Sequence, residues 1–221
     1  MVLTNIVAIK NNLFKYKKTR SELATFVKQS MPVFWVIGPI GCGKSTLAEM
    51  IAKSSKFHLI DVKLLIKEDT LKVKWNRTAK NYKKDQVSSE IMLNMLKKEI
   101  IRTSQNAIGY IIDGFPTNIH EAKLFEDRIC NVNVIIYLTL VLDGLLARKV
   151  TQIGTYHVNE ERIQYIKSMN NLNKLSKLYN KKTIKLHANY PPEATCAKLV
   201  EILEDFWGYK FLRLYNKHLP D

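Results

Sequence analysis

The chain has 221 residues, a net charge of +15, 46% hydrophobic residues and 25% charged residues. This composition is ordinary for a globular protein, and the length suits one α/β domain with short extensions. No apolar run reaches the roughly 18–20 residues of a membrane span, and the first 20 residues lack the apolar segment of a secretory signal. We therefore expect a cytoplasmic protein without a membrane anchor, although the basic start leaves an organelle presequence open.

Strand-like and helix-like segments alternate along the chain. Residues 1–31 form an N-terminal extension with apolar residues at helical spacing. Short apolar runs then predict buried strands at 33–37, 57–60, 109–113, 132–138 and 183–186. Helices are expected at 47–54, from Ser88 or Ser89 through Ile100, and at 118–129. Further helices are expected after the fourth strand through Lys149, at 159–179 and at 192–206. Such alternation predicts a three-layer α/β sandwich around a parallel sheet.

Three segments interrupt or follow this pattern. Residues 61–84 are polar and basic and predict an inserted helical segment, and residues 151–158 predict a short loop. Residues 207–221 form a tail that is rich in aromatic and leucine side chains. We expect the tail to pack on the domain, with docking on a partner as the alternative.

A phosphate-loop pattern follows the first predicted strand. Residues 38–45 contain Gly, four residues, and then Gly-Lys-Ser. Between a strand and a helix, such glycines let backbone N–H groups turn toward phosphate oxygens. Lys44 is expected to reach the β- and γ-phosphates of ATP, and Ser45 to bind Mg²⁺. The expected nucleotide-binding residues of this loop are Gly38, Gly41, Cys42, Gly43, Lys44, Ser45 and Thr46.

Cys42 is an unusual residue inside this loop. A helix N-terminus lowers the pKa of a thiol, so Cys42 could be reactive, but we favour a packing role. Cys130 and Cys196 are far from it in the sequence, and no pair of cysteines has metal-ligand spacing. We expect three reduced thiols.

A second motif, Asp-Gly-Phe-Pro, occupies residues 113–116 at the end of a predicted buried strand. In open α/β sheets, ligands bind beyond the carboxyl ends of the strands. Asp113 is therefore expected to hold a Mg²⁺-bound water beside the phosphate loop. The alternative is a simple turn, because Asp-Gly is a common turn pair.

Together the two motifs resemble those of the adenylate kinase family, and the similarity extends over residues 32–206. The short loop at 151–158 resembles the lid of short-lid members, which are mostly cytosolic. The resemblance implies a five-stranded parallel sheet, ATP with Mg²⁺, and transfer of the γ-phosphoryl group to AMP or another nucleoside monophosphate. It also implies catalytic roles for Lys44, Asp113 and Arg148, and a nucleotide-binding role for Arg148. The implied acceptor contacts are Val87, Gly114, Phe115 and Glu121.

The chain departs from the family pattern where the acceptor and the lid are expected. The family segment His-x-x-Thr-Gly-Asp-Leu-Leu-Arg corresponds to residues 58–66, and Ile66 replaces its arginine. Other family arginines correspond to Thr117, Thr155 and Ile166, and the glutamine that reads adenine corresponds to Glu121. Losing one phosphate-clamping arginine typically costs ~10³ or more in rate. Basic neighbours that could substitute are Lys63, Lys67, Arg162 and Lys167.

Two functions therefore stay open: an ATP-dependent nucleoside monophosphate kinase, or a catalytically weakened nucleotide-binding or scaffold module. A different small-molecule kinase with a phosphate loop is a third, which the motif at 113–116 disfavours. The charge of +15 attracts anions, but no nucleic-acid recognition motif accompanies it. Basic faces or the C-terminal tail could instead contact a protein partner, and we expect a monomer.

Overall fold

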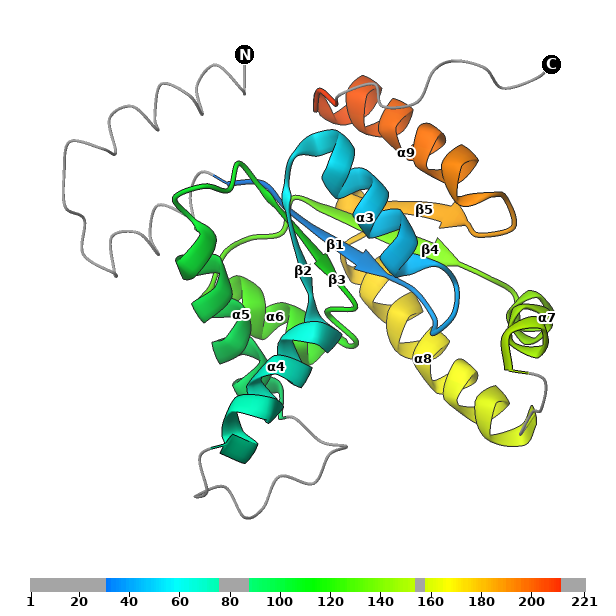
Figure 1. Ribbon diagram of the computed structural model, residues 1–221. Coiled ribbons are helices and arrows are strands. Elements are labelled where there is room, and N and C mark those ends of the chain that lie inside the picture. The colour runs from blue at the N-terminus through cyan, green and yellow to red at the C-terminus, as the bar shows by residue number, and fades with distance from the viewer. Residues whose placement is uncertain (1–30, 76–87, 154–157, 212–221) are drawn as a thin grey trace.

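The computed structural model describes residues 31–75, 88–153 and 158–211. Within these ranges one parallel sheet has the strand order β2-β3-β1-β4-β5 (Figure 1). The strands are β1 (Val33–Ile37), β2 (His58–Asp61), β3 (Tyr110–Asp113), β4 (Val134–Thr139) and β5 (Thr183–His187). The predicted α/β fold with a five-stranded parallel sheet is confirmed.

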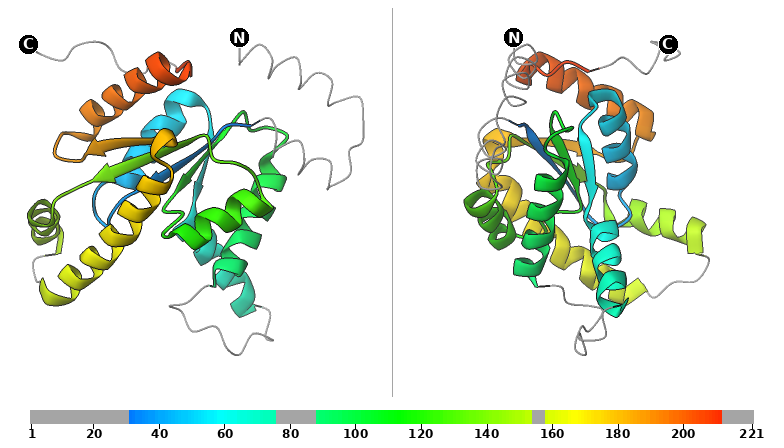
Figure 2. Two further views of the ribbon diagram at one scale, coloured as in Figure 1. Left: turned by 180° about the vertical axis from the view of Figure 1, so that it is seen from behind. Right: turned by 60° about the vertical axis from the view of Figure 1, so that its left-hand side comes forward.

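Helices cover both faces of this sheet. They are α3 (Lys44–Ser55), α4 (Val62–Trp75), α5 (Ser89–Thr103), α6 (Ile119–Arg128), α7 (Leu142–Ile153), α8 (Val158–Leu178) and α9 (Pro192–Trp207). Figure 2 shows α3 and α9 on one face and α5, α6 and α8 on the other. None of the helices in the described ranges is long and apolar enough to cross a membrane.

The central strand β1 supplies side chains to two separate cores. Successive side chains of a strand point to opposite faces. Phe34 therefore packs in the core beneath α3 and α9, while Trp35 packs in the core beneath α5, α6 and α8. The Trp35 ring meets Phe115 and Phe125 edge-on, with ring centroids 6.0 and 5.4 Å apart. Truncating so large a buried ring typically costs about 3–5 kcal/mol, so β1 is held in place from both sides.

Side-chain caps explain several element boundaries. Ser88 accepts a hydrogen bond from the Ile91 N–H and begins α5, as predicted. Asn118 caps α6 in the same way. The fourth strand begins later than its predicted start at residue 132. Asn133 Oδ1 accepts a hydrogen bond from the Val33 N–H at 2.8 Å. A side chain therefore satisfies the first N–H of β1, and the pairing of β1 with β4 begins one residue later, at Phe34 and Val134.

The inserted and terminal segments are described only in part. Residues 1–30, 76–87, 154–157 and 212–221 lie outside the described residues, which removes most of the N-terminal extension and part of the 61–84 insert. The predicted loop at 151–158 is shorter in the structure, because α7 continues to Ile153 and α8 begins at Val158.

The first residues of the C-terminal tail pack on the domain. The Tyr209 ring lies edge-on to Phe34, with centroids 4.9 Å apart, and the Phe211 N–H donates to a Glu204 carboxylate oxygen at 3.2 Å. Gly208 allows this return of the chain, because it adopts the left-handed conformation with φ 67° after α9.

Candidate functional site

The phosphate loop connects β1 to α3 at the carboxyl edge of the sheet. A Cβ on Gly38 would lie 2.3 Å from the Leu138 carbonyl oxygen, so only glycine fits there. Gly43 precedes α3 with φ 98°, a left-handed conformation that allows the chain to turn into the helix at Lys44. This turn explains why α3 begins earlier than the predicted 47–54.

Lys44 is folded back onto its own loop. Its ammonium donates a hydrogen bond to the Pro39 carbonyl oxygen at 2.7 Å. Burial lowers the pKa of Lys44, while the Cys42 thiol and the Asp113 carboxylate oppose that shift. A cation with one backbone partner in a partly buried loop is suited to exchange that partner for a phosphate oxygen.

Asp113 lies beside the loop because β3 is the neighbour of β1 and Asp113 is in register with Val36. Ser45 Oγ donates to Asp113 Oδ2 at 2.5 Å. The other carboxylate oxygen, Oδ1, is buried and has no hydrogen-bond partner in the described part of the chain. Burial raises the pKa of Asp113, and the hydrogen bond from Ser45 and the charge of Lys44 counteract this.

This pair of side chains fits a hydrated divalent cation. A buried carboxylate oxygen without a partner is costly, and Mg²⁺ or one of its waters would satisfy it. No group of three or more His, Cys, Asp or Glu side chains in the described ranges could hold a metal alone. Such a site suits Mg²⁺, which usually takes few protein ligands and completes its shell with phosphates and water.

Arg148 reaches the loop from α7, as the sequence predicts for a nucleotide-site residue. One of its guanidinium nitrogens donates to the Cys42 carbonyl oxygen at 3.2 Å, and the other donates to the Ala188 carbonyl oxygen. The side chain therefore ties the phosphate loop to the segment after β5. Both acceptors are neutral carbonyls, which a phosphate oxygen could replace.

The Cys42 side chain is buried, with 1% of its surface exposed. Burial raises the pKa of the Cys42 thiol more than Lys44 lowers it. The thiol is therefore protonated and shielded, which supports the packing role and contradicts the reactive alternative. Cys130 and Cys196 are also buried and free.

The segment predicted to bind the acceptor begins where β2 ends. Asp61 is in register with Asp113, and its Oδ1 accepts the N–H groups of Lys63 at 2.8 Å and Leu64 at 3.2 Å. Asp61 therefore caps α4. Ile66, at the position of a family arginine, is partly buried and packs against the core beneath α5, α6 and α8.

Glu121 and Phe115, two of the predicted acceptor contacts, are both buried within the fold. Glu121 is buried and accepts hydrogen bonds from the Thr117 N–H at 2.8 Å and the Thr117 hydroxyl at 2.9 Å. Ser89 Oγ donates to its other oxygen at 3.3 Å. Phe115 has 0% of its surface exposed, because its ring packs against Trp35 and Phe125 in the core. Val87 lies outside the described residues.

Helix α8 approaches the phosphate loop with residues that the sequence analysis did not identify. Gln164, Tyr165 and Ser168 line a cavity of about 20 Å³ together with Pro39 and Ile40. Their spacing over one helical turn is a signal that could have identified this face. Ile166, at another arginine position, is 49% exposed, and Arg162 one turn earlier is also exposed. Thr155 lies outside the described residues.

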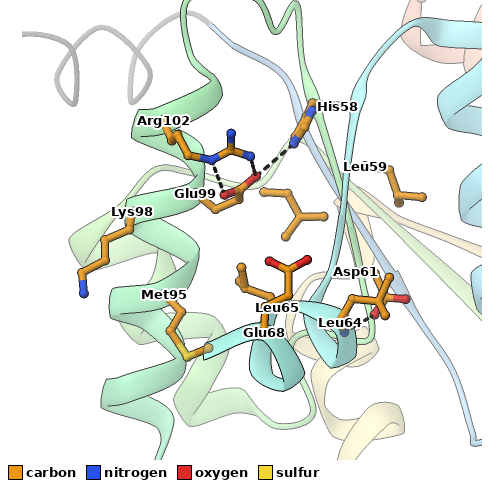
Figure 3. Close-up of a pocket in the computed structure, with 11 residues that line it drawn as sticks. His58, Leu59, Asp61, Leu64, Leu65, Glu68, Met95, Lys98, Glu99 and Arg102 are labelled. Atoms are coloured by element: carbon orange, nitrogen blue, oxygen red, sulfur yellow. Dashed lines mark hydrogen bonds and ion pairs between the residues drawn. The ribbon is translucent and has the colours of Figure 1, made fainter. Parts of the chain in front are cut away.

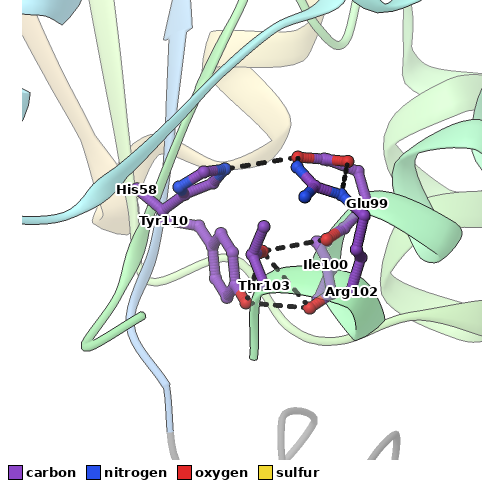
Figure 4. Close-up of polar contacts among 6 residues, drawn as sticks. All are labelled: His58, Glu99, Ile100, Arg102, Thr103 and Tyr110. Carbon is purple, nitrogen blue, oxygen red and sulfur yellow. Dashed lines mark hydrogen bonds and ion pairs between the residues drawn. The ribbon is translucent and has the colours of Figure 1, made fainter. Parts of the chain in front are cut away.

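A larger pocket of about 680 Å³ lies elsewhere, along the edge strand β2 between α4 and α5 (Figure 3). Glu99 lies at one end of this pocket, where it accepts two hydrogen bonds from Arg102 and contacts the His58 ring nitrogen at 3.4 Å (Figure 4). These bonds lower the pKa of Glu99, chiefly through Arg102. Because these charges satisfy one another, we interpret the cluster as structural.

The fold and the loop define an α/β protein with a phosphate-loop motif beside a strand-terminal aspartate. The adenylate kinase family model matches residues 36–194, and the chain belongs to that family. Membership supports a nucleotide-kinase-like function, and the family in general uses ATP and Mg²⁺.

The chain is similar to adenylate kinases of distant organisms. Adenylate kinase 1 of Drosophila melanogaster is 24% identical over 184 residues, which cover 79% of this chain and 80% of the relative. An adenylate kinase of Prochlorococcus marinus is 29% identical over 135 residues, covering 58% and 71%. One of Talaromyces marneffei is 33% identical over 123 residues, covering 52% and 45%.

Proposed function

We propose that this protein binds ATP with Mg²⁺ at residues 38–45 and transfers the γ-phosphoryl group to a nucleoside monophosphate, with AMP as the first candidate. The observation that carries this proposal is the arrangement of Ser45 and Asp113. Their 2.5 Å hydrogen bond holds a buried carboxylate whose second oxygen has no partner among the described residues.

On the donor side, the side chains already in place have distinct roles. Lys44 exchanges the Pro39 carbonyl for a phosphate oxygen, and the glycine backbone allows close approach. Arg148 redirects its guanidinium from neutral carbonyls to phosphate, which it can hold with two parallel bonds. Bound Mg²⁺ supplies neutralisation of the phosphate charge that develops during transfer. Asp113 and Ser45 orient it.

On the acceptor side, one observation favours a second candidate function. Glu121 is bonded to Thr117 and Ser89, so its carboxylate is engaged within the protein. Together with Ile66 packed against the core, this arrangement supports a weakened nucleotide-binding module of the same fold. Such a protein would bind ATP with little transfer, and its basic faces or tail would contact a protein partner.

A coupled assay with ATP and each nucleoside monophosphate separates the two functions, with titration calorimetry of ATP run beside it. Turnover near the ~10 s⁻¹ of a median enzyme establishes the kinase. ATP binding without turnover establishes the weakened module. Asp113→Asn is the matched variant, because it keeps the shape and removes the charge. Absence of ATP binding by the wild type contradicts both functions. We expect a monomer in both cases, which sedimentation checks.

A further inference from the structure

Lys63 lies at the junction between the acceptor side and the phosphate loop. It is the second residue of α4 and follows directly from the carboxyl end of β2. Its N–H is held by Asp61, and Asp61 pairs in register with Asp113, the partner of Ser45. The backbone of Lys63 is therefore fixed at the same sheet edge as the phosphate loop.

The charge of Lys63 acts on two groups of the nucleotide site. Burial is the main cause that lowers the pKa of Lys44, and the Lys63 ammonium lowers it further. Burial raises the pKa of Asp113, and the Lys63 ammonium is among the charges that counteract this rise. Both effects place the Lys63 charge within electrostatic range of Lys44 and Asp113.

The Lys63 side chain is exposed, and its ammonium makes no hydrogen bond or ion pair with the side chains described in residues 31–68, 88–148 and 162–211. It is also absent from the pocket beside β2, whose α4 lining is Leu64, Leu65 and Glu68 (Figure 3). Adjacent residues on a helix are ~100° apart, so Lys63 projects from a different face than these three. The ammonium is thus free for a ligand at the sheet edge that also carries the phosphate loop.

The sequence at this position reverses the charge of the family pattern. The segment that corresponds to residues 58–66 has aspartate in the family where this chain has Lys63, and arginine where it has Ile66. One cation is therefore lost from α4 and another is gained three residues earlier. Three residues are about one helical turn, so the charge stays on the same end of α4.

We propose that Lys63 is the cation that holds the phosphate of the acceptor, in place of the arginines missing at Ile66 and Thr117. This inference rests on the proposed function and names the group that recognises its acceptor. An ammonium on a flexible stem is a point charge without the two-pronged geometry of arginine. The acceptor is therefore recognised through its phosphate charge, with weaker control of its orientation.

The test measures binding of AMP and of adenosine, which lacks the phosphate, to protein saturated with a non-hydrolysable ATP analogue. Lys63→Ala is expected to weaken AMP binding by roughly tenfold, in line with the loss of one charge-assisted contact. Adenosine binding stays unchanged, and Lys63→Arg restores AMP binding. Lys98→Ala, an exposed lysine of α5 beside the β2 pocket, serves as the matched control and retains wild-type binding.

The outcomes separate this inference from the proposed function. Equal AMP affinity in wild type and Lys63→Ala overturns the role of Lys63 and leaves the kinase proposal intact. A wild type that binds the ATP analogue but does not distinguish AMP from adenosine overturns both the phosphate contact and the proposed acceptor. If Lys63→Ala loses the ATP analogue while its thermal unfolding is unchanged, Lys63 serves the donor phosphates and the inference is wrong. Turnover adds a further readout, because the KM for AMP should change more than kcat.

Discussion

The donor and acceptor sides share one sheet edge but differ in what their polar groups contact. On the predicted donor side, Asp113 keeps a buried oxygen without a partner among the described residues, and within the same residues Lys44 donates its one hydrogen bond to a carbonyl of its own loop. On the acceptor side, the Glu121 carboxylate is already bonded to Thr117 and Ser89. The first arrangement leaves polar groups that a ligand can bind, whereas in the second the carboxylate is already hydrogen-bonded within the protein.

The contrast has a physical origin. A phosphate loop binds largely through backbone N–H groups, and its shape depends on close packing such as that of Gly38 against Leu138. Acceptor binding depends instead on single long side chains, which can be replaced without disturbing the sheet. Ile66 shows this directly, because it packs against the core where the family has arginine. One side of a site can therefore change while the other is kept.

The largest expected effect concerns the donor side. Lys44→Ala removes the only cation of the phosphate loop itself, and we expect ATP binding to weaken by about 1.5–3 kcal/mol, the strength of a charged hydrogen bond. Titration calorimetry measures this loss. Lys53→Ala, an exposed lysine on the same helix, should bind ATP like the wild type. Equal affinity in Lys44→Ala and wild type would show that the loop is not the nucleotide site.

The second expected effect is a gain on the lid side. Ile166→Arg restores a family arginine at a position that is 49% exposed, so the fold should tolerate it. We expect kcat to rise ~10-fold, a fraction of the ~10³ of an optimised arginine, because the surrounding site is not built for it. Steady-state kinetics measure the change. Ile163→Arg, 67% exposed on the same helix, is the control, and an equal gain there would indicate a nonspecific charge effect.

The third prediction is a stability effect on the predicted acceptor side. Glu121→Ala removes the buried carboxylate that accepts the Thr117 N–H and hydroxyl. Thr117 itself is exposed, so water replaces part of the loss, and we expect a cost of about 0.5–1.5 kcal/mol of unfolding free energy. Thermal unfolding should report a lower Tm. Glu201→Ala, an exposed position of α9, should unfold like the wild type. An unchanged Tm in Glu121→Ala would mean that Glu121 is free to serve a ligand after all.

The sequence predicted the fold because the fold depends on local patterns. The apolar run at β1 and the glycines that follow it identify the strand, the loop and the turn into α3. The place of Asp113 at the end of β3 also followed from the apolar run before it, while its role stays a prediction. The predicted packing role of Cys42 also followed, since a small side chain inside a tight loop is buried by its surroundings.

The acceptor side could not be predicted to the same depth. Nothing in the spacing of Thr117 and Glu121 shows that they are hydrogen-bonded to each other, because that contact depends on how the chain turns into α6. The pocket beside β2 was also missed. It depends on the relative placement of α4 and α5, which a linear pattern does not contain.

The smallest expected effect is the pH dependence of the stability of the ligand-free protein, which follows from the burial of Asp113. Burial raises its pKa in the folded chain above the ~3.9 of an exposed aspartate. The unfolded chain therefore loses this proton at lower pH than the folded chain. As pH rises from the unfolded to the folded pKa, the contribution of Asp113 shifts toward unfolding, and the destabilisation is complete above the folded pKa.

Asp113→Asn removes this titration. We expect the variant, without ligand, to be at least as stable as the wild type at pH 7, with its advantage shrinking as pH falls through the raised pKa of Asp113. Thermal unfolding at several pH values measures both Tm curves, and Asp143→Asn on α7 is the control carboxylate. Magnesium-dependent ATP binding should fall in the same variant. A lower Tm for Asp113→Asn at pH 7 would instead show that the carboxylate stabilises the fold through its hydrogen bond with Ser45. The buried position of Oδ1 would then be explained by folding stability and would give no support to a bound cation.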